Sequence, residues 1–352
     1  MKHYDYVPIF FVDSKSGSRE ARSVENVHSQ KLNQWQGWYC SSGKRTLYID
    51  FDGNLFAGTC EVGGWRGNIF RDGFDVDGLD KWIQCTKQFC SCGADMSSPK
   101  VKTKDLIPDK WDDFRSKIRG ELQGDQNGPL GNYDTVLCGN GLRYKLIAWD
   151  LGRRCNFACS YCYPGSHNNF ETHKGLKALQ RAVDKINDFW LRGERGFFNI
   201  TGGEPTIHPQ YIEFVEHILS KNPGNIITTT TNGSRDPQYF SQLFRLSSLT
   251  FSAHLETLQN ERAYANFVEN LSVCCEMKRA GEVPRTRYMQ ARIMLKPGML
   301  DLARRLRGDI LKIPQFEQYG VVLGDLLHQS NERSLVSDYS EDEKQFVADN
   351  QF

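Results

Sequence analysis

A chain of 352 residues is long enough for one large domain or two of ordinary size. Its 44 basic and 43 acidic side chains leave a net charge of +1, so bulk charge gives no reason to expect a nucleic acid or an anionic membrane as partner. No run approaches the ~20 apolar residues of a membrane helix, and the N-terminal apolar run is too short for a signal peptide. We therefore expect a soluble, cytoplasmic protein, in which clustered cysteines more often bind metal or react than form disulfides.

The first 96 residues predict a small module rich in glycine, tryptophan and cysteine. Residues 45–60, RTLYIDFDGNLFAGTC, predict a β-hairpin with a turn at Asp52-Gly53-Asn54 and a second strand that ends near Cys60. Five thiols in so short a segment exceed what packing requires, and a reducing cytoplasm argues against disulfides. The five cysteines of residues 1–96 are Cys40, Cys60, Cys85, Cys90 and Cys92.

Two further segments carry weaker patterns. Residues 97–142 predict a connector, because the turn-rich stretches SSPK and GDQNGPLGN flank one possible helix in DKWDDFRSKIRGELQ. Residues 326–352 are expected to form a C-terminal tail or helix. Cys274 and Cys275 extend an apolar pattern at helical spacing, so we expect them to pack in a core.

Residues 143–325 alternate between apolar strand-like runs and amphipathic helices. The strand-like runs are KLIAWDLG, GFFNITGG, NIITTTTNG, SLTFSAHLE, TRYMQARIML and YGVVLG. Such β/α alternation implies a parallel sheet with right-handed crossovers. About six units fall two short of a closed eightfold barrel, so the predicted fold class is α/β, with a partial (β/α)6 barrel that follows the cysteine-rich hairpin module.

Polar residues follow several of these strands and are expected to converge at one place. In such sheets, sites form at the carboxyl ends of the strands. The stretch RRCNFACSYCYPG follows the first strand, GGEP (residues 202–205) follows the second, and Ser252 and Glu256 lie at the end of the fourth. We expect these side chains to line a single site.

Cys155, Cys159 and Cys162 form the pattern CxxxCxxC after the first strand. Three thiolates do not complete the four-cysteine shell of an ordinary iron–sulfur cluster. Either a fourth protein ligand lies elsewhere, which gives structural zinc or an electron-transfer cluster, or one metal position stays open to a small molecule. Tyr161, just before the last cysteine, can lie against a flat ring.

Together, CxxxCxxC, the aromatic Tyr161, GGEP and the six β/α units resemble a radical S-adenosylmethionine (SAM) enzyme over residues 145–325. The resemblance implies a [4Fe–4S] cluster on the three cysteines, with SAM bound to the fourth iron through its amino and carboxylate groups. Gly202, Gly203 and Glu204 would receive the SAM amino group, because glycines allow close backbone approach and a carboxylate suits an ammonium.

The same resemblance assigns three further residues. Ser252 or Glu256 would hold the SAM ribose, and Arg292 would pair with the SAM carboxylate. The alternatives are a surface ion pair for Arg292 and a helix-start carboxylate for Glu256. His254 is either structural or catalytic. The chemistry implied is one-electron reduction of SAM to methionine and a 5′-deoxyadenosyl radical, which takes a hydrogen atom from the substrate, with a flavodoxin- or ferredoxin-type protein as reductant.

Residues 36–95 resemble the auxiliary-cluster modules, called SPASM or Twitch, that many radical SAM enzymes carry. Here the module precedes the barrel and holds cysteines for one cluster plus a spare. The resemblance implies an auxiliary [4Fe–4S] cluster on four of the five thiols, or on three with a substrate-accessible iron. We expect the module to cover the barrel mouth.

The sequence leaves the reaction open between oxidation, epimerisation and other modification of a small molecule or peptide. Two other classes remain as alternatives. A non-catalytic iron–sulfur electron carrier explains the clustered thiols but not GGEP or the six β/α units. A zinc-stabilised binding protein, for instance for RNA, lacks the excess positive charge that would support it.

Overall fold

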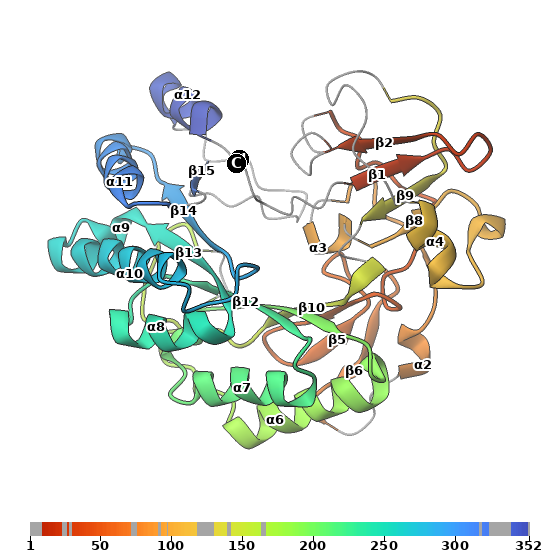
Figure 1. Ribbon diagram of the computed structural model, residues 1–352, viewed down its shortest axis with the longest axis horizontal. Helices are drawn as coiled ribbons and strands as arrows, with labels where there is room; N and C mark the ends of the chain where they lie inside the picture. Colours follow the sequence, from red (N-terminus) through yellow and green to blue (C-terminus); the bar gives the residue numbers. More distant parts are fainter. Residues whose placement is uncertain are drawn as a thin grey trace. The chain divides into compact units, whose positions relative to one another are not determined.

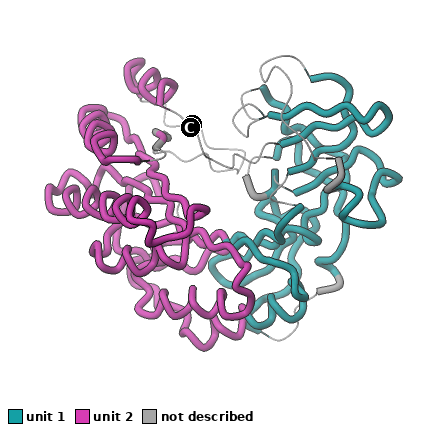
Figure 2. The backbone as a smooth tube through the Cα atoms, in the orientation of Figure 1, with its two compact units in different colours: residues 1–148, 184–198 teal, residues 149–183, 199–352 magenta. Residues whose placement is uncertain are grey.

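The computed structural model describes residues 9–22, 27, 30–71, 76–90, 93–96, 98–117, 130–138, 142–162, 167–316, 319–323 and 339–350. Cys92, one of the predicted cluster ligands, lies outside these described residues. The chain divides into two compact units (Figure 2): unit 1 comprises residues 1–148 and 184–198, and unit 2 comprises residues 149–183 and 199–352.

Unit 1 contains a six-stranded sheet in the order β2-β1-β9-β8-β3-β7. Its strands are β1 (Ile9–Val12), β2 (Arg19–Arg22), β3 (Tyr39–Cys40), β7 (Ile83–Gln84), β8 (Lys100–Val101) and β9 (Thr135–Cys138). Neighbouring strands pair antiparallel. An apolar cluster that includes Trp35, Cys90 and Met96 packs against this sheet through Ile9, Phe11 and Val136.

The predicted hairpin is present in unit 1 as β4 (Thr46–Ile49) and β5 (Asn54–Phe56), and β6 (Trp65–Asn68) pairs with β5. The turn is fixed by Asp50, whose Oδ1 accepts hydrogen bonds from the N–H groups of residues 52 and 54 at 2.9 and 2.8 Å. Gly53 has a φ of +87°, which favours glycine. The turn prediction is confirmed.

The second hairpin strand ends at Phe56 and not near Cys60. The reason is Asp95, which lies just before the end of α3 (Gly93–Met96) and is 1% exposed. Its carboxylate accepts hydrogen bonds from the N–H groups of Thr59 and Cys60 at 3.1 and 2.8 Å. These bonds draw the backbone out of the strand before Cys60.

Residues 97–142, predicted as a connector, supply two strands of the six-stranded sheet and α4 (Trp111–Lys117). β9 pairs with β1 from Ile9↔Cys138 to Val12↔Thr135. All four residues of β9 are buried. This segment is therefore part of unit 1, and its short apolar run was obscured by the turn-rich residues on both sides.

The strands predicted for residues 143–325 are all present and follow one another in the sheet order β15-β14-β13-β12-β11-β10. They are β10 (Lys145–Asp150), β11 (Gly196–Thr201), β12 (Ile226–Thr231), β13 (Ser248–His254), β14 (Met289–Leu295) and β15 (Tyr319–Leu323). The pairs from β12 to β15 are parallel. The division between the units passes through β10 and β11.

The predicted helices alternate with these strands. They are α6 (Leu176–Lys185), α7 (Tyr211–Lys221), α8 (Pro237–Leu246), α10 (Glu261–Arg279) and α11 (Leu300–Lys312), with the short α9 (Leu255–Leu258) between β13 and α10. A π-helical turn extends α6, α2 (Val76–Leu79) lies in unit 1, and α12 (Glu341–Asn350) ends the described chain. In the part of the chain that the structure describes, no helix has the length and apolarity to cross a membrane.

The two faces of β13 and β14 differ in chemistry. Phe251 of β13 is fully buried against Phe240 of α8 and Phe267 of α10, with ring centroids 4.9 and 5.9 Å away. Figure 1 shows α8 and α10 together along the strands of unit 2. Because side chains alternate across a strand, Ser252 and its register partner Arg292 lie on the opposite, polar face. The sheet thus has an apolar face that packs against helices and an opposite face that carries polar side chains.

This arrangement makes Phe251 a central packing residue. We expect Phe251→Ala to lower the free energy of unfolding by about 3–5 kcal/mol, because it leaves a cavity between α8 and α10. Urea unfolding followed by circular dichroism measures the change. Leu311→Ala is the matched control, since Leu311 is 51% exposed, and an equal effect of the two changes would contradict the packing.

Candidate active site

The cysteine loop that follows β10 is tied by its backbone to the segment GGEP. The Gly203 N–H donates to the Gly152 carbonyl at 2.7 Å, and the Glu204 N–H donates to the Arg154 carbonyl at 2.8 Å. Buried backbone groups require such partners. The predicted meeting of the first two strand ends is therefore present in detail.

Both glycines of GGEP stand where a side chain does not fit. A Cβ atom on Gly203 would lie 2.4 Å from the Arg154 carbonyl oxygen and 2.5 Å from that of Arg153. Gly202 has a φ of +132°, and a Cβ there would lie 2.7 Å from the Gly152 oxygen. The glycine pair thus permits two backbone segments to touch.

Glu204 connects the end of β11 to the end of β12. It is 2% exposed. Its Oε1 accepts hydrogen bonds from the Thr206 N–H at 3.0 Å and from the Thr231 hydroxyl at 2.8 Å, and its Oε2 accepts one from the Asn232 N–H at 2.5 Å. Burial raises the pKa of Glu204 above its ordinary value, although these donors oppose the shift. The carboxylate therefore positions two strand ends, and Oε2 retains acceptor capacity for a ligand.

The three thiols of the loop lie within electrostatic range of one another. Burial is the main cause that raises the pKa of Cys155, and it raises the pKa of Cys159 to about 12; charge at Cys162 adds to both. Three thiolates here need a positively charged partner, which suits the iron of a cluster. No three His, Cys, Asp or Glu side chains among the described residues are grouped to hold a single metal ion; in a cluster each cysteine binds a different iron.

Tyr161 has a partner that the sequence left open. Its hydroxyl oxygen lies 2.7 Å from Nδ1 of His254, and the two rings stack with centroids 5.9 Å apart at 15°. Burial lowers the pKa of His254 to about 4, so the imidazole is neutral at pH 7 and Nδ1 can accept a hydrogen bond from the Tyr161 hydroxyl. His254 at the end of β13 thus holds the aromatic residue of the cysteine motif in place.

Glu256 anchors the cysteine loop from the start of α9. Its carboxylate accepts hydrogen bonds from the Ser160 N–H and hydroxyl at 2.7 and 2.6 Å, and it pairs with Lys296, which follows β14. Burial raises the pKa of Glu256, but Lys296 and Ser160 outweigh it and hold the pKa below its ordinary value. Sequence reasoning placed Glu256 at this strand end and missed both partners.

Ser252 and Arg292, which the resemblance assigns to SAM, lie on adjacent strands. They are register partners between β13 and β14, and residues two positions earlier continue the row, where Gln290 Nε2 donates to the Thr250 hydroxyl at 2.7 Å. These four side chains share the face opposite Phe251. The polar row is the sheet surface on which a ligand can be held.

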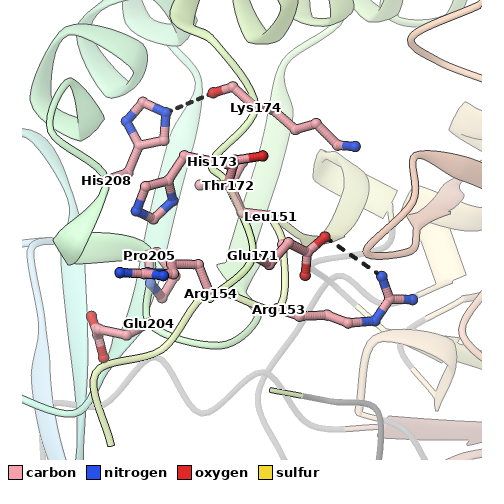
Figure 3. Close-up of a pocket in the computed structure, with 11 residues that line it drawn as sticks. Leu151, Arg153, Arg154, Glu171, Thr172, His173, Lys174, Glu204, Pro205 and His208 are labelled. Atoms are coloured by element: carbon pink, nitrogen blue, oxygen red, sulfur yellow. Dashed lines mark hydrogen bonds and ion pairs between the residues drawn. The ribbon is translucent and has the colours of Figure 1, made fainter. Parts of the chain in front are cut away.

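A cavity of 20 Å³ is lined by residues 151–154, by residues 171–174 and by Glu204, Pro205 and His208 (Figure 3). In it, Arg153 pairs with Glu171 at 3.8 Å, and the rings of His173 and His208 meet edge to face at 4.9 Å. Burial, with the charge of His208, lowers the pKa of His173 to about 4. The cavity has room for about one water.

A larger pocket of 570 Å³ opens at the ends of β12 and β13, next to the cysteine loop. Its lining comprises Phe157, Asn232, Gly233, Ser234, Arg235, Asp236, Leu258, Asn260, Arg262, Ala263, Asn266 and Phe267. Arg235 and Arg262 are exposed. Sequence reasoning did not identify this pocket, because its residues come from the cysteine loop, from the loop after β12 and from α9, α10 and the turn between them.

Part of the chain is similar in sequence to a known family. Residues 149–280 match the sequence model of the Radical SAM superfamily. The match spans the three loop cysteines, GGEP and the end of β13.

Curated relatives are similar over parts of their length. A GTP 3′,8-cyclase of Trichodesmium erythraeum is 27% identical over 109 residues, which cover 31% of this chain and 33% of that protein. The mycofactocin maturase MftC of Mycobacterium ulcerans is 29% identical over 98 residues, which cover 28% of this chain and 25% of MftC. The solved structure of histidine-tagged anSMEcpe with bound AdoMet aligns over 54% of each chain, at 14% identity and a TM-score of 0.39. The chain thus spans about a third or less of the two curated proteins.

The glycine pair gives a direct test of the site. We expect Gly203→Ala to destabilise the protein by about 1–3 kcal/mol, because the new methyl group must push two carbonyl oxygens away. It should also reduce the iron bound per chain after anaerobic reconstitution, since the cysteine loop moves. The melting temperature and an iron assay measure the two effects.

Gly175→Ala is the control, because a Cβ on Gly175 meets nothing within 4 Å. It should leave stability and iron content near those of the unmodified protein. Full iron loading and an unchanged melting temperature in Gly203→Ala would show that the close approach is not needed.

Proposed function

We propose that this protein, whose residues 149–280 match the Radical SAM superfamily model, is an enzyme that holds a [4Fe–4S] cluster through Cys155, Cys159 and Cys162 and cleaves SAM reductively. The observation that carries the proposal is the contact of the cysteine loop with GGEP, through the hydrogen bonds of Gly203 and Glu204. When bound, the cluster and SAM supply one-electron chemistry that removes a hydrogen atom from a substrate and yields 5′-deoxyadenosine.

In this proposal, the residues of the chain bind and orient SAM. The backbone at Gly202 and Gly203, together with Oε2 of Glu204, receives the SAM ammonium. Tyr161, held by His254, offers its ring to the cofactor. Ser252 and Arg292 lie on the polar face of the sheet, where a ribose hydroxyl and a carboxylate are suitable partners.

The strand order from β10 to β15 fits a partial (β/α)6 barrel. Six sequential strands with intervening helices leave one face for the reaction. The polar row of Thr250, Ser252, Gln290 and Arg292 supports the assignment of that face to ligands. A reactive intermediate formed on this face must be kept from water.

Unit 1 would hold a second [4Fe–4S] cluster. Cys40 ends β3; the Cys85 N–H donates to the Trp38 carbonyl at 2.7 Å, beside β3, and the Cys90 N–H donates to the Asn33 carbonyl at 2.9 Å. Burial raises the pKa of Cys60, Cys85 and Cys90, and charge at Cys40 adds to each shift. Four thiols within mutual electrostatic range make Cys40, Cys60, Cys85 and Cys90 the proposed ligand set.

The substrate and the reductant are identified only by class. The partial relatives include a nucleotide cyclase and a maturase, so a small molecule or a peptide in the cytoplasm is the proposed substrate, with oxidation or epimerisation as candidate reactions. A flavodoxin- or ferredoxin-type reductant is the proposed electron donor. Phe157 of the cysteine loop lines the 570 Å³ pocket together with Arg235 and Arg262. The positive charge of these arginines favours an electron-carrier protein with an acidic surface.

The SAM-cleaving site is tested by replacing its ligands. The unmodified protein, reconstituted without oxygen and supplied with SAM and dithionite, should release 5′-deoxyadenosine. The triple change Cys155→Ala, Cys159→Ala, Cys162→Ala should release none and keep about half of the iron. The control is Cys274→Ala with Cys275→Ala in α10, where both thiols are buried core groups. SAM cleavage by the triple variant would refute the assignment.

The second cluster is tested by iron content. The unmodified protein should bind about eight irons per chain, and Cys60→Ala with Cys90→Ala should bind about four. The double variant should still cleave some SAM without forming product, because the first site is intact. A count near four irons in the unmodified protein, together with stoichiometric zinc, would instead make unit 1 a structural zinc module.

A further inference from the structure

Lys100 is a buried lysine inside unit 1. It is 1% exposed and lies opposite Cys40 in the antiparallel pair of β8 and β3. Residues that face each other in such a pair point to the same side, with Cβ atoms about 4.5–5.5 Å apart. Lysine is almost never fully buried without a charged partner.

The ammonium of Lys100 has neutral partners. Its Nζ donates to the carbonyl oxygens of Asp95 and Ser98 at 2.6 and 2.8 Å and lies 4.6 Å from the centre of the Trp35 ring. The Asp95 carboxylate instead accepts hydrogen bonds from the N–H groups of Thr59 and Cys60. Among the ion pairs closer than 4 Å in the described residues, none includes Lys100. The hydrogen-bond partners of this buried cation are therefore neutral carbonyl groups, and the Asp95 carboxylate acts on it from beyond ion-pair distance.

The proposed thiol ligands lie on the elements that surround this ammonium. Cys40 is its register partner, and Cys90 packs in the same apolar cluster as Trp35, over which Nζ lies. Cys60 is bonded through its N–H to Asp95. Cys85 follows directly after β7, the other neighbour of β3. Thiolates that hold a cluster would therefore place negative charge close to Lys100, in addition to the charge of the Asp95 carboxylate.

We propose that Lys100 is the built-in counter-charge of the auxiliary cluster and raises its reduction potential. This inference rests on the proposed cluster in unit 1. When the oxidised cluster takes up one electron from an external donor, it becomes one unit more negative. A fixed positive charge at short range in a poorly polarisable interior stabilises the reduced state more than the oxidised state. Lys100 would therefore make the auxiliary cluster a better electron acceptor.

The test measures the potential of this cluster alone, in full-length protein that also carries the three Cys→Ala changes of the SAM site. We expect Lys100→Met to shift the midpoint potential to more negative values in a titration with dithionite, followed by electron paramagnetic resonance. Lys102→Met removes an exposed lysine two residues away and should leave the potential unchanged. An unchanged potential in Lys100→Met with full iron content would overturn the inference.

A third variant keeps the test decisive if Lys100→Met does not take up iron. Lys100→Arg keeps the charge, so it should bind iron and keep a potential near that of the unchanged lysine. A potential that falls in Lys100→Arg, or loss of its cluster, would show that charge is not the decisive property. If the protein with Lys100 intact binds no iron in this background, the auxiliary cluster itself is refuted, a result distinct from either outcome for the potential.

Discussion

The candidate site depends on one close contact between two backbone segments. Residues 152–154 of the cysteine loop lie against residues 202–204 so closely that a Cβ atom on Gly203 would overlap two carbonyl oxygens. Glu204 then carries this contact to the next strand, because its carboxylate accepts hydrogen bonds from Thr231 and Asn232. Glu256 holds the other end of the loop through Ser160. Three successive strand ends are thus fixed around three thiols.

The two groups of thiols lie in different electrostatic surroundings. Glu204 and Glu256 are among the charges that raise the pKa of Cys155 and Cys159, respectively, after burial. In unit 1, burial raises the pKa of Cys85 and Cys90, the Lys100 ammonium opposes this shift, and the Asp95 carboxylate adds to it less strongly. Negative neighbours disfavour added electrons and a positive neighbour favours them. The proposed SAM-cleaving cluster is therefore expected to be the stronger reductant, and the auxiliary cluster the better electron acceptor.

The sequence predicted what depends on local pattern. Strands such as KLIAWDLG and helices such as α10 repeat their apolar residues at fixed spacing, and the cysteine motif and GGEP are contiguous. It did not predict the strands β8 and β9, whose partners lie far along the chain, or the turn of the backbone at Cys60 toward Asp95. The contacts of Tyr161 with His254 and of Lys100 with Cys40 were also missed, because they depend on register and on side chains that meet only after folding.

The central claim is that the cluster on the cysteine loop keeps one iron open for SAM. Electron paramagnetic resonance of the reduced, reconstituted protein tests it directly, with spectra recorded before and after SAM is added. Binding of the SAM amino and carboxylate groups to iron would change the electronic environment of the cluster. We therefore expect the spectrum to change when SAM is added. The triple cysteine variant should show no such change. A spectrum of the unmodified protein that SAM leaves unaltered would contradict the account.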